Sequence, residues 1–282
     1  MSKYFNETIK ARSGALATGE LKQAAVQDYQ EVAVAKGPVV DLGAPGLERC
    51  RKLEIPLGGL LRAQFQGSDL LDAAEESYRA LRTRLLKLMS VNGMRSVVIT
   101  SAEQGEGKTM TSLNLALCCA QLHDLRVLLI DGDIRSRGLT RTLGSPAGPG
   151  LAEILSGECR PEQAVFSTDL ANLQVIGSGS PSTPPAELLA SSRLHELISW
   201  GNESFKLIIV DSPPVVNLSD VELITAACDG VLTVVRARRT GREVLKKCVS
   251  RLDAKKVLGV VYNAAAGSSN RYNYAYSAPK EK

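Results

Sequence analysis

Residues 96–109, which read SVVITSAEQGEGKT, decide the fold of this 282-residue chain. The β-branched run at 96–100 predicts a buried strand, and residues 108–122 predict a helix. Between them, Ala102-x4-Gly107-Lys108-Thr109 fits the phosphate-loop pattern Gly-x4-Gly-Lys-Ser/Thr, which often accepts alanine first. A glycine-rich turn that happens to hold a lysine is the alternative. The strand before it, the helix after it and the threonine all argue against that alternative.

The chemistry of phosphate binding explains why these residue types stand at this spacing. Gly105 and Gly107 let consecutive backbone N–H groups turn inward, and the helix N-terminus adds positive potential. Lys108 is expected to bridge the β- and γ-phosphates of ATP, and Thr109 to place its hydroxyl on Mg²⁺. The predicted nucleotide contacts are Gly105, Glu106, Gly107, Lys108, Thr109 and Met110.

Carboxylates end two further predicted strands. Asp131 ends the strand at 127–131 and is followed closely by Asp133, and Asp211 ends the strand at 207–211. Ligands of parallel α/β sheets bind beyond the carboxyl ends of the strands, so all three are expected at one edge. A lone aspartate there is usually a helix cap or a turn former. Three beside a phosphate loop favour metal binding by Thr109, Asp133 and Asp211, and proton acceptance by one aspartate.

Apolar strands alternate with helices through the rest of the chain. Further strands are predicted at 231–235 and 257–261, and a helix at 185–200. A helix from Asp69 has one apolar stripe, formed by Ala74, Tyr78, Leu81, Leu85 and Leu88. The pattern predicts an α/β fold with a mostly parallel sheet flanked by helices. We expect an N-terminal extension or linker at 1–66, a catalytic domain at 67–264 and a flexible tail at 265–282.

Composition limits the classes of function and the location. The formal charge of +4 is too small to imply nucleic acid, and no apolar run approaches the length of a membrane span. Six cysteines without metal spacing and a charged N-terminus without an apolar core predict a cytoplasmic protein. The basic segment 236–256 is more consistent with a solvated helix face than with an anion-docking surface. Asn263, after the last strand, is either a contact for the adenine edge or a turn residue.

The tail carries three of the seven tyrosines of the chain, at Tyr272, Tyr274 and Tyr276. They stand among polar residues with too little apolar surface nearby to offset the cost of ordering. Such tyrosines suit a phosphoacceptor role, because a tether raises the local concentration of each hydroxyl at a neighbouring site. Exposed tyrosines without a role, or a strand added to a partner, are the alternatives.

Taken together, the motifs resemble those of the bacterial tyrosine autokinases (BY-kinases) of capsular and extracellular polysaccharide systems. SAEQGEGKT, LLIDGDIR and LIIVDSPPV resemble their Walker A, Walker A′ and Walker B motifs, and STPPAELLASSRL and the tyrosine tail fit as well. The segment EESYRALRTRL is similar to the Glu-x2-Arg-x2-Arg helix, with Thr83 where the family has a further arginine. The resemblance implies a P-loop NTPase of the deviant-Walker, MinD/ParA-like arrangement, and covers roughly residues 70–282.

The resemblance also implies an activity. Family members transfer the γ-phosphoryl group of Mg-ATP to tail tyrosines of a neighbouring protomer in a ring, and regulate polysaccharide polymerisation and export. Glu76, Arg79 and Arg82 would then be interface residues, Lys108, Asp131, Asp133 and Asp211 catalytic, and Asp131 the first choice for the base. The implied partners are a membrane-spanning chain-length regulator, which recruits the kinase to the inner membrane face, and a tyrosine phosphatase.

Two rival functions share the same residues. A ParA/MinD-type ATPase switch would carry an early lysine in the loop, where this chain has Glu103. A nucleotide-gated scaffold without kinase activity would need the same phosphate-binding groups, so the motifs exclude it poorly.

Overall fold

The computed structural model describes residues 51–52, 68–144, 148–216 and 218–264. Eight strands form one sheet in the order β1-β4-β5-β3-β6-β2-β7-β8. All neighbouring pairs are parallel except β4 and β5, which are antiparallel. The strands are β1 Arg51–Lys52, β2 Ser96–Ser101, β3 Val127–Asp131, β4 Val165–Ser167, β5 Leu173–Ile176, β6 Leu207–Asp211, β7 Gly230–Arg236 and β8 Val257–Asn263. The predicted fold class, an α/β fold with a mostly parallel sheet, is confirmed.

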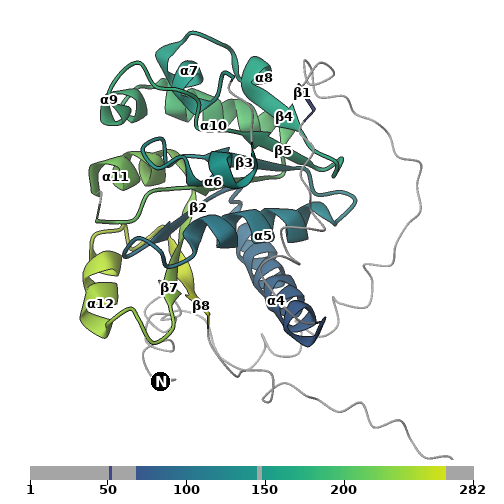
Figure 1. Cartoon of the computed structure of the whole chain (residues 1–282), viewed down its shortest axis with the longest axis vertical. Helices are drawn as coiled ribbons and strands as arrows, with labels where there is room; N and C mark the ends of the chain where they lie inside the picture. Colours follow the sequence, from purple (N-terminus) through teal and green to yellow (C-terminus); the bar gives the residue numbers. More distant parts are fainter. Residues whose placement is uncertain (1–50, 53–67, 145–147, 217, 265–282) are drawn as a thin grey trace, which may run out of the picture. The chain divides into compact units, whose positions relative to one another are not determined.

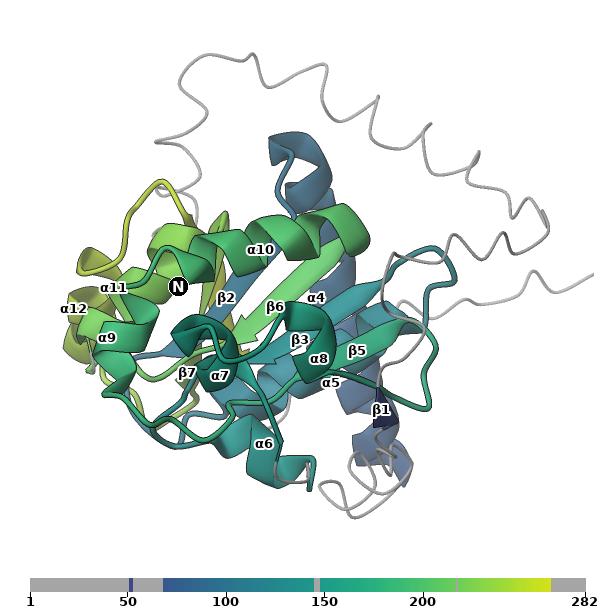
Figure 2. The ribbon, with the colours of Figure 1, turned by 90° about the horizontal axis from the view of Figure 1, so that it is seen from above.

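Helices cover both faces of this sheet (Figures 1 and 2). They are α4 Ser68–Asn92, α5 Lys108–Ala120, α6 Gly138–Thr142, α7 Leu151–Ser156, α8 Pro161–Ala164, α9 Pro185–Leu189, α10 Arg193–Ser204, α11 Leu218–Ala227 and α12 Arg242–Ser250. Figure 1 shows α4 and α5 on one side of the sheet and α7, α9 and α10 on the other. No helix in the described part of the chain combines the length and the hydropathy that a membrane crossing requires.

The central strands are apolar on both faces because both faces are buried. In β3, Leu128 and Ile130 contact the cluster under α7, α9, α10 and α11, whereas Val127 and Leu129 contact the cluster under α4 and α5. Period-2 alternation places successive side chains on opposite faces, so a parallel strand covered on both sides is continuously hydrophobic. This explains why short apolar runs identified the central strands.

Helix α4 packs through the stripe expected from the sequence. Leu85 is fully buried, and Tyr78 and Leu81 pack against the same cluster as α5. At the far end of α5, the Arg82 guanidinium donates to the carbonyl oxygen of Cys118 at 2.6 Å. The last carbonyls of a helix have no partner within the helix, so this bond satisfies one of them and anchors α4 to α5.

The structure corrects the predicted helix at 185–200, which is two helices, α9 and α10. Ser191 ends the first of them, because its hydroxyl and its backbone N–H both donate to the Leu188 carbonyl. Such local side-chain bonds compete with helix continuation. The basic segment forms α12, which buries Cys248 but leaves Val244 38% exposed.

Several expectations lie outside the described residues. These are the tail tyrosines Tyr272, Tyr274 and Tyr276 and nearly all of the N-terminal extension, of which only β1 is described. The strands β4 and β5 were not predicted at all, and β5 lies directly beside β3 in the sheet.

Candidate functional site

The phosphate loop lies between β2 and α5, as its pattern predicts. Gly105 and Gly107 have φ angles of 81° and 95°, in the left-handed region that favours glycine. Gly107 has no room for a side chain either, because a Cβ there would overlap the side-chain amide of Asn263. Helix α5 therefore begins from a tight turn whose backbone only glycine adopts without strain.

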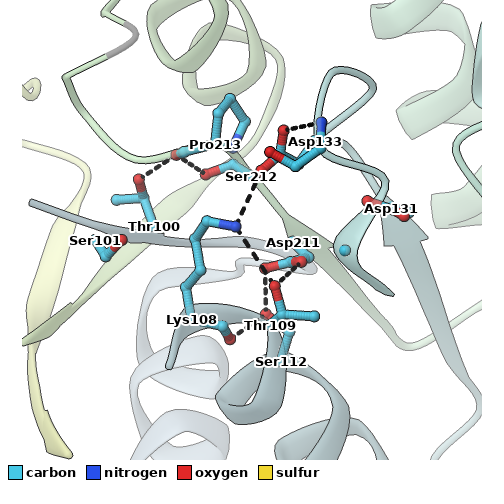
Figure 3. A network of polar contacts seen from close by, with 12 residues as sticks. Thr100, Ser101, Lys108, Thr109, Ser112, Asp131, Asp133, Asp211, Ser212 and Pro213 are labelled. Atoms are coloured by element: carbon cyan, nitrogen blue, oxygen red, sulfur yellow. Dashed lines mark hydrogen bonds and ion pairs between the residues drawn. The ribbon is translucent and has the colours of Figure 1, made fainter. Parts of the chain in front are cut away.

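Lys108 is held in the site by an acid. Its Nζ lies 3.0 Å from Asp133 Oδ2, in an ion pair whose side chains are 11% and 1% exposed. It also approaches the Thr109 hydroxyl at 3.4 Å. Figure 3 shows Lys108 extending from the start of α5 toward Asp133. The other Asp133 oxygen accepts from the Ser136 backbone N–H at 3.0 Å, which fixes the carboxylate.

Asp211 receives two hydroxyl groups from α5. Thr109 Oγ1 donates to Oδ2 at 2.7 Å, and Ser112 Oγ donates to Oδ1 at 3.1 Å (Figure 3). Asp211 is fully buried, and burial raises its pKa to about 7, although the Lys108 charge and the two hydroxyl bonds act in the opposite direction. A buried carboxylate beside a threonine hydroxyl is a set of hard oxygen donors.

Asp131 is the register partner of Asp211 across β3 and β6, so the two carboxylates lie on neighbouring strand ends. Its Oδ2 accepts from the Thr140 hydroxyl at 2.6 Å and from the Thr140 N–H at 2.8 Å. Its Oδ1 is buried and has no hydrogen-bond partner among the residues that the structure describes. Burial raises the pKa of Asp131, against the lowering effect of the Thr140 bonds. A buried carboxylate oxygen without a donor is available to take up a proton.

The remaining predicted nucleotide contacts have other partners in this structure. Asn263 Nδ2 donates to the Glu106 carbonyl oxygen at 2.9 Å, and its Oδ1 accepts from the Ala264 N–H. The Glu106 side chain is buried and accepts a hydrogen bond from the Thr240 hydroxyl. Met110 is half-buried against the core cluster under α4 and α5. Contact of these three residues with a nucleotide stays a prediction.

The expected interface residues on α4 differ from one another in exposure. Arg79 is 48% exposed and Glu76 is 72% exposed, and the two pair with each other at 3.4 Å. Arg79 also pairs with Glu75 at 3.0 Å. Arg82, in contrast, is partly buried and bound to Cys118 of its own chain. Glu76 and Arg79 are thus available on the surface, whereas Arg82 has an established role within the fold.

Three residues that shape the site, Ser112, Thr140 and Thr240, were not predicted. Ser112 carries a weak signal, because it stands one helical turn after Lys108 and so shares its face. Thr140 and Thr240 carry none, since their contacts depend on how distant loops meet. Beside the site, Arg135 forms an ion pair with Asp220 of α11 at 2.6 Å.

Comparison with known proteins agrees with this geometry. A family model described as an AAA domain matches residues 94–256. The tyrosine-protein kinase CpsD of Streptococcus pneumoniae serotype 4 is 34% identical over 207 residues, which cover 72% of this chain and 90% of that protein. The solved kinase domain of the Escherichia coli tyrosine kinase ETK is 29% identical, with a TM-score of 0.66, covering 79% of this chain and 86% of that one.

Some relatives are much longer. The putative tyrosine-protein kinase EpsB of Ralstonia nicotianae is 33% identical over 230 residues, which cover 79% of this chain but only 30% of that protein. This chain therefore spans about a third of the length of some curated relatives and nearly the whole length of CpsD. The phosphate loop, the three aspartates at neighbouring strand ends and these matches place this chain in the family of bacterial tyrosine autokinases.

Proposed function

We propose that the chain is an ATP-dependent protein-tyrosine autokinase that phosphorylates Tyr272, Tyr274 and Tyr276 in trans within an oligomer. The observation that carries this proposal is the convergence of Lys108 with the buried Asp131, Asp133 and Asp211 at one edge of the sheet. Relatives named as tyrosine kinases share the fold of the domain that builds this edge.

The donor set fits a magnesium ion. Thr109 Oγ1 and Asp211 Oδ2 lie 2.7 Å apart. Lys108 Nζ contacts both Thr109 Oγ1 and Asp133 Oδ2, so Asp133 lies beside the same group. No three His, Cys, Asp or Glu side chains among the described residues form a complete metal cage. Mg²⁺ usually binds one or two carboxylates together with phosphates and waters, so Thr109, Asp211 and Asp133 would hold it beside ATP. When bound, it would neutralise charge that develops on the phosphate oxygens.

The chain's own residues would then perform the transfer. The tyrosyl oxygen forms a bond to the γ-phosphorus, the bond from that phosphorus to the β–γ bridging oxygen breaks, and ADP leaves. Asp131 Oδ1, for which the described part of the chain provides no hydrogen-bond donor, takes the tyrosyl proton, and the raised pKa of this carboxyl brings it nearer the working pH of a base. Lys108 stabilises the negative charge on the transferred group.

The wider role follows from the family resemblance. It comprises regulation of exopolysaccharide or capsule polymerisation and export, activation by a membrane-spanning chain-length regulator, reset by a tyrosine phosphatase, and a cytoplasmic location at the inner membrane face. Nucleic acid is not among the proposed partners. The corresponding division of the chain is an extension at 1–66, a kinase domain at 67–264 and an acceptor tail at 265–282.

A ParA/MinD-type ATPase is the second candidate, because it would use the same phosphate loop. Its early loop lysine is replaced by Glu103, whose side chain is exposed and carries the wrong charge to reach a partner's phosphates. A nucleotide-gated scaffold is separated from a kinase only by the appearance of phosphotyrosine.

Incubation with Mg-ATP is expected to place phosphate on Tyr272, Tyr274 and Tyr276, which mass spectrometry of the tail peptide measures. The triple Tyr→Phe variant at these positions should remain unmodified there while it still hydrolyses ATP, because its active site is intact. ATP hydrolysis by the wild-type protein without any tail phosphotyrosine would support the ATPase candidate instead.

Transfer in trans can be tested with the same variant. The triple Tyr→Phe chain has an intact site without acceptors, and a Lys108→Met chain has intact acceptors with a disabled site. Their mixture should yield phosphotyrosine only on the Lys108→Met chain, at a rate that rises with total concentration. An unmodified Lys108→Met chain in that mixture, beside a modified wild-type protein, would mean transfer within one chain.

Replacement of Arg79 by alanine is expected to weaken the oligomer and slow autophosphorylation, because it removes a surface-exposed positive charge of α4 at the proposed interface. Arg79 suits this test better than Arg82, whose loss would also free the Cys118 carbonyl. Arg84→Ala, an exposed arginine on the same helix, is the matched control. Sedimentation velocity should show smaller species for Arg79→Ala alone, and identical profiles for both variants would refute the interface assignment.

A further inference from the structure

Glu106 stands between the two glycines of the phosphate loop, but it does not face solvent. Its side chain belongs to a residue that is 1% exposed, and all of its hydrogen-bond partners are neutral groups. Burial of a carboxylate is costly unless hydrogen bonds compensate it. The hydrogen bonds that stabilise this buried carboxylate therefore indicate its role in the loop.

The contacts of Glu106 tie three segments together. One carboxylate oxygen accepts from the Glu103 backbone N–H at 2.8 Å, inside the loop. The other accepts from the hydroxyl of Thr240, at the turn between β7 and α12. Its backbone carbonyl accepts from Asn263 Nδ2 at 2.9 Å, at the end of β8. Thr240 and Asn263 thus reach the same loop residue from two neighbouring strands of the sheet.

The turn after β7 holds a second loop residue as well. Arg236 donates to the Gly105 carbonyl oxygen at 3.2 Å, and the Thr240 hydroxyl in turn accepts from the Arg236 N–H at 3.1 Å. The guanidinium of Arg239 lies beside Gly105, 3.4 Å from where a Cβ would stand. Two carbonyl groups of the loop, those of Gly105 and Glu106, therefore accept hydrogen bonds from residues outside the loop.

The hydrogen bonds to these two carbonyl oxygens have a consequence for anion binding. A loop binds phosphate when its N–H groups converge and its carbonyls point elsewhere. Glycine-rich segments lose much conformational entropy on ordering, so a loop ordered before the anion arrives binds it more tightly. The contacts around Glu106 supply that order without touching the anion.

We propose that Glu106, Thr240 and Asn263 form a brace that holds the phosphate loop in its phosphate-binding shape. They are positioning residues, acting through the backbone of residues 103–107 and not through contact with ATP. The inference rests on the proposed nucleotide site but not on kinase activity. It assigns Asn263 to the phosphate end of the site, whereas its position at the end of β8 also permits contact with adenine.

The decisive variant is Thr240→Val, which removes the hydroxyl and keeps the shape. Binding of Mg-ADP and of magnesium pyrophosphate, measured by calorimetry, is expected to weaken about tenfold, as loss of one bond to a charged group predicts. Thr240→Ser restores the hydroxyl and should bind as the wild type does. Thr225→Val is the matched control, because the Thr225 hydroxyl bonds only within α11. Equal affinity of Thr240→Val and wild type, or equal weakening in Thr225→Val, would overturn the brace.

Asn263→Asp separates the brace from adenine recognition. Aspartate has the same shape but no N–H to donate, so the brace predicts weaker binding of both pyrophosphate and ADP. Weaker ADP binding with unchanged pyrophosphate binding would assign Asn263 to adenine and remove it from the brace. Thermal unfolding of each variant shows whether the fold is retained, and a fall in affinity that merely follows the fall in unfolding temperature contradicts a positioning role.

These measurements use binding alone, so they stand apart from the proposed kinase function. If Thr240→Val loses pyrophosphate affinity while the wild-type protein forms no phosphotyrosine, the brace is supported and the proposed kinase function is refuted. The reverse outcome, active autophosphorylation with unchanged affinity in Thr240→Val, would refute the brace alone.

Discussion

Replacing Lys108 with methionine is expected to reduce autophosphorylation by about a hundredfold to a thousandfold, which is the usual effect of removing one group that stabilises transition-state charge. Lys108 Nζ carries the positive charge that lies within the site, 3.0 Å from Asp133 Oδ2. Methionine has a similar length but neither charge nor donor. Initial rates of phosphotyrosine formation at saturating Mg-ATP measure the effect.

The same substitution has a structural cost that must be separated from the catalytic one. It leaves Asp133 buried without its ion-pair partner, and breaking a buried pair on one side typically costs about 3–5 kcal/mol. A second replacement, Asp133→Asn, removes the stranded charge. The double variant should regain most of the stability in urea unfolding and remain inactive. If the double variant regained both stability and transfer, Lys108 would have no part in the mechanism.

Replacing Asp211 with asparagine is expected to have two opposite effects. Transfer should fall about a hundredfold or more, because the buried carboxylate proposed to hold Mg²⁺ is lost. The metal-free protein, however, should become more stable at pH 8. Asparagine keeps the shape and avoids burying a charge, and the hydroxyls of Thr109 and Ser112 can rotate to suit the amide.

The pH dependence of that stability follows from the raised pKa of Asp211. In the unfolded chain the carboxyl has a pKa of 3.8, and in the folded protein burial raises it to about 7. Between these values the folded protein binds more protons than the unfolded chain, so this group makes the wild type less stable as pH rises, until the effect levels off above pH 7. The full shift corresponds to at most about 4 kcal/mol.

Urea unfolding of wild type and Asp211→Asn in a chelating buffer, at intervals from pH 4 to pH 8, measures this difference. The variant should gain little at pH 4 and progressively more toward pH 7, with a plateau above it. Asp131, whose pKa is also raised by burial, is present in both proteins, and its charge is one of the causes that raise the pKa of Asp211. A constant difference between the two proteins across this range would contradict a titrating Asp211.

The parts of the site that the sequence revealed are those that one contiguous segment builds. The strand, the two glycines, Lys108 and Thr109 stand in one motif, and their geometry follows from local backbone rules. The meeting of Asp131 with Asp211 follows from a topological rule, since neighbouring parallel strands end at the same edge. Both inferences needed no knowledge of how distant loops pack.

The parts that escaped prediction depend on tertiary packing or on very short elements. The Thr240 bond joins residues 134 positions apart, through a turn with no motif of its own. The strands β4 and β5 have three and four residues, too few for a periodic signal. The break between α9 and α10 occurs where the Ser191 hydroxyl donates to the Leu188 carbonyl. A hydrophobic periodicity in the sequence carries no information about such a local side-chain hydrogen bond.

Helix α5 joins two features that lie at its opposite ends. Lys108 and Thr109 occupy its first turn, and the Cys118 carbonyl held by Arg82 of α4 lies in its last. A helix of 13 residues is a stiff rod about 20 Å long. The Arg82 bond therefore connects α4 to the same rod whose first turn carries the ammonium group and the hydroxyl. A force on the outer helix would have a direct mechanical route, through this rod, to the phosphate loop.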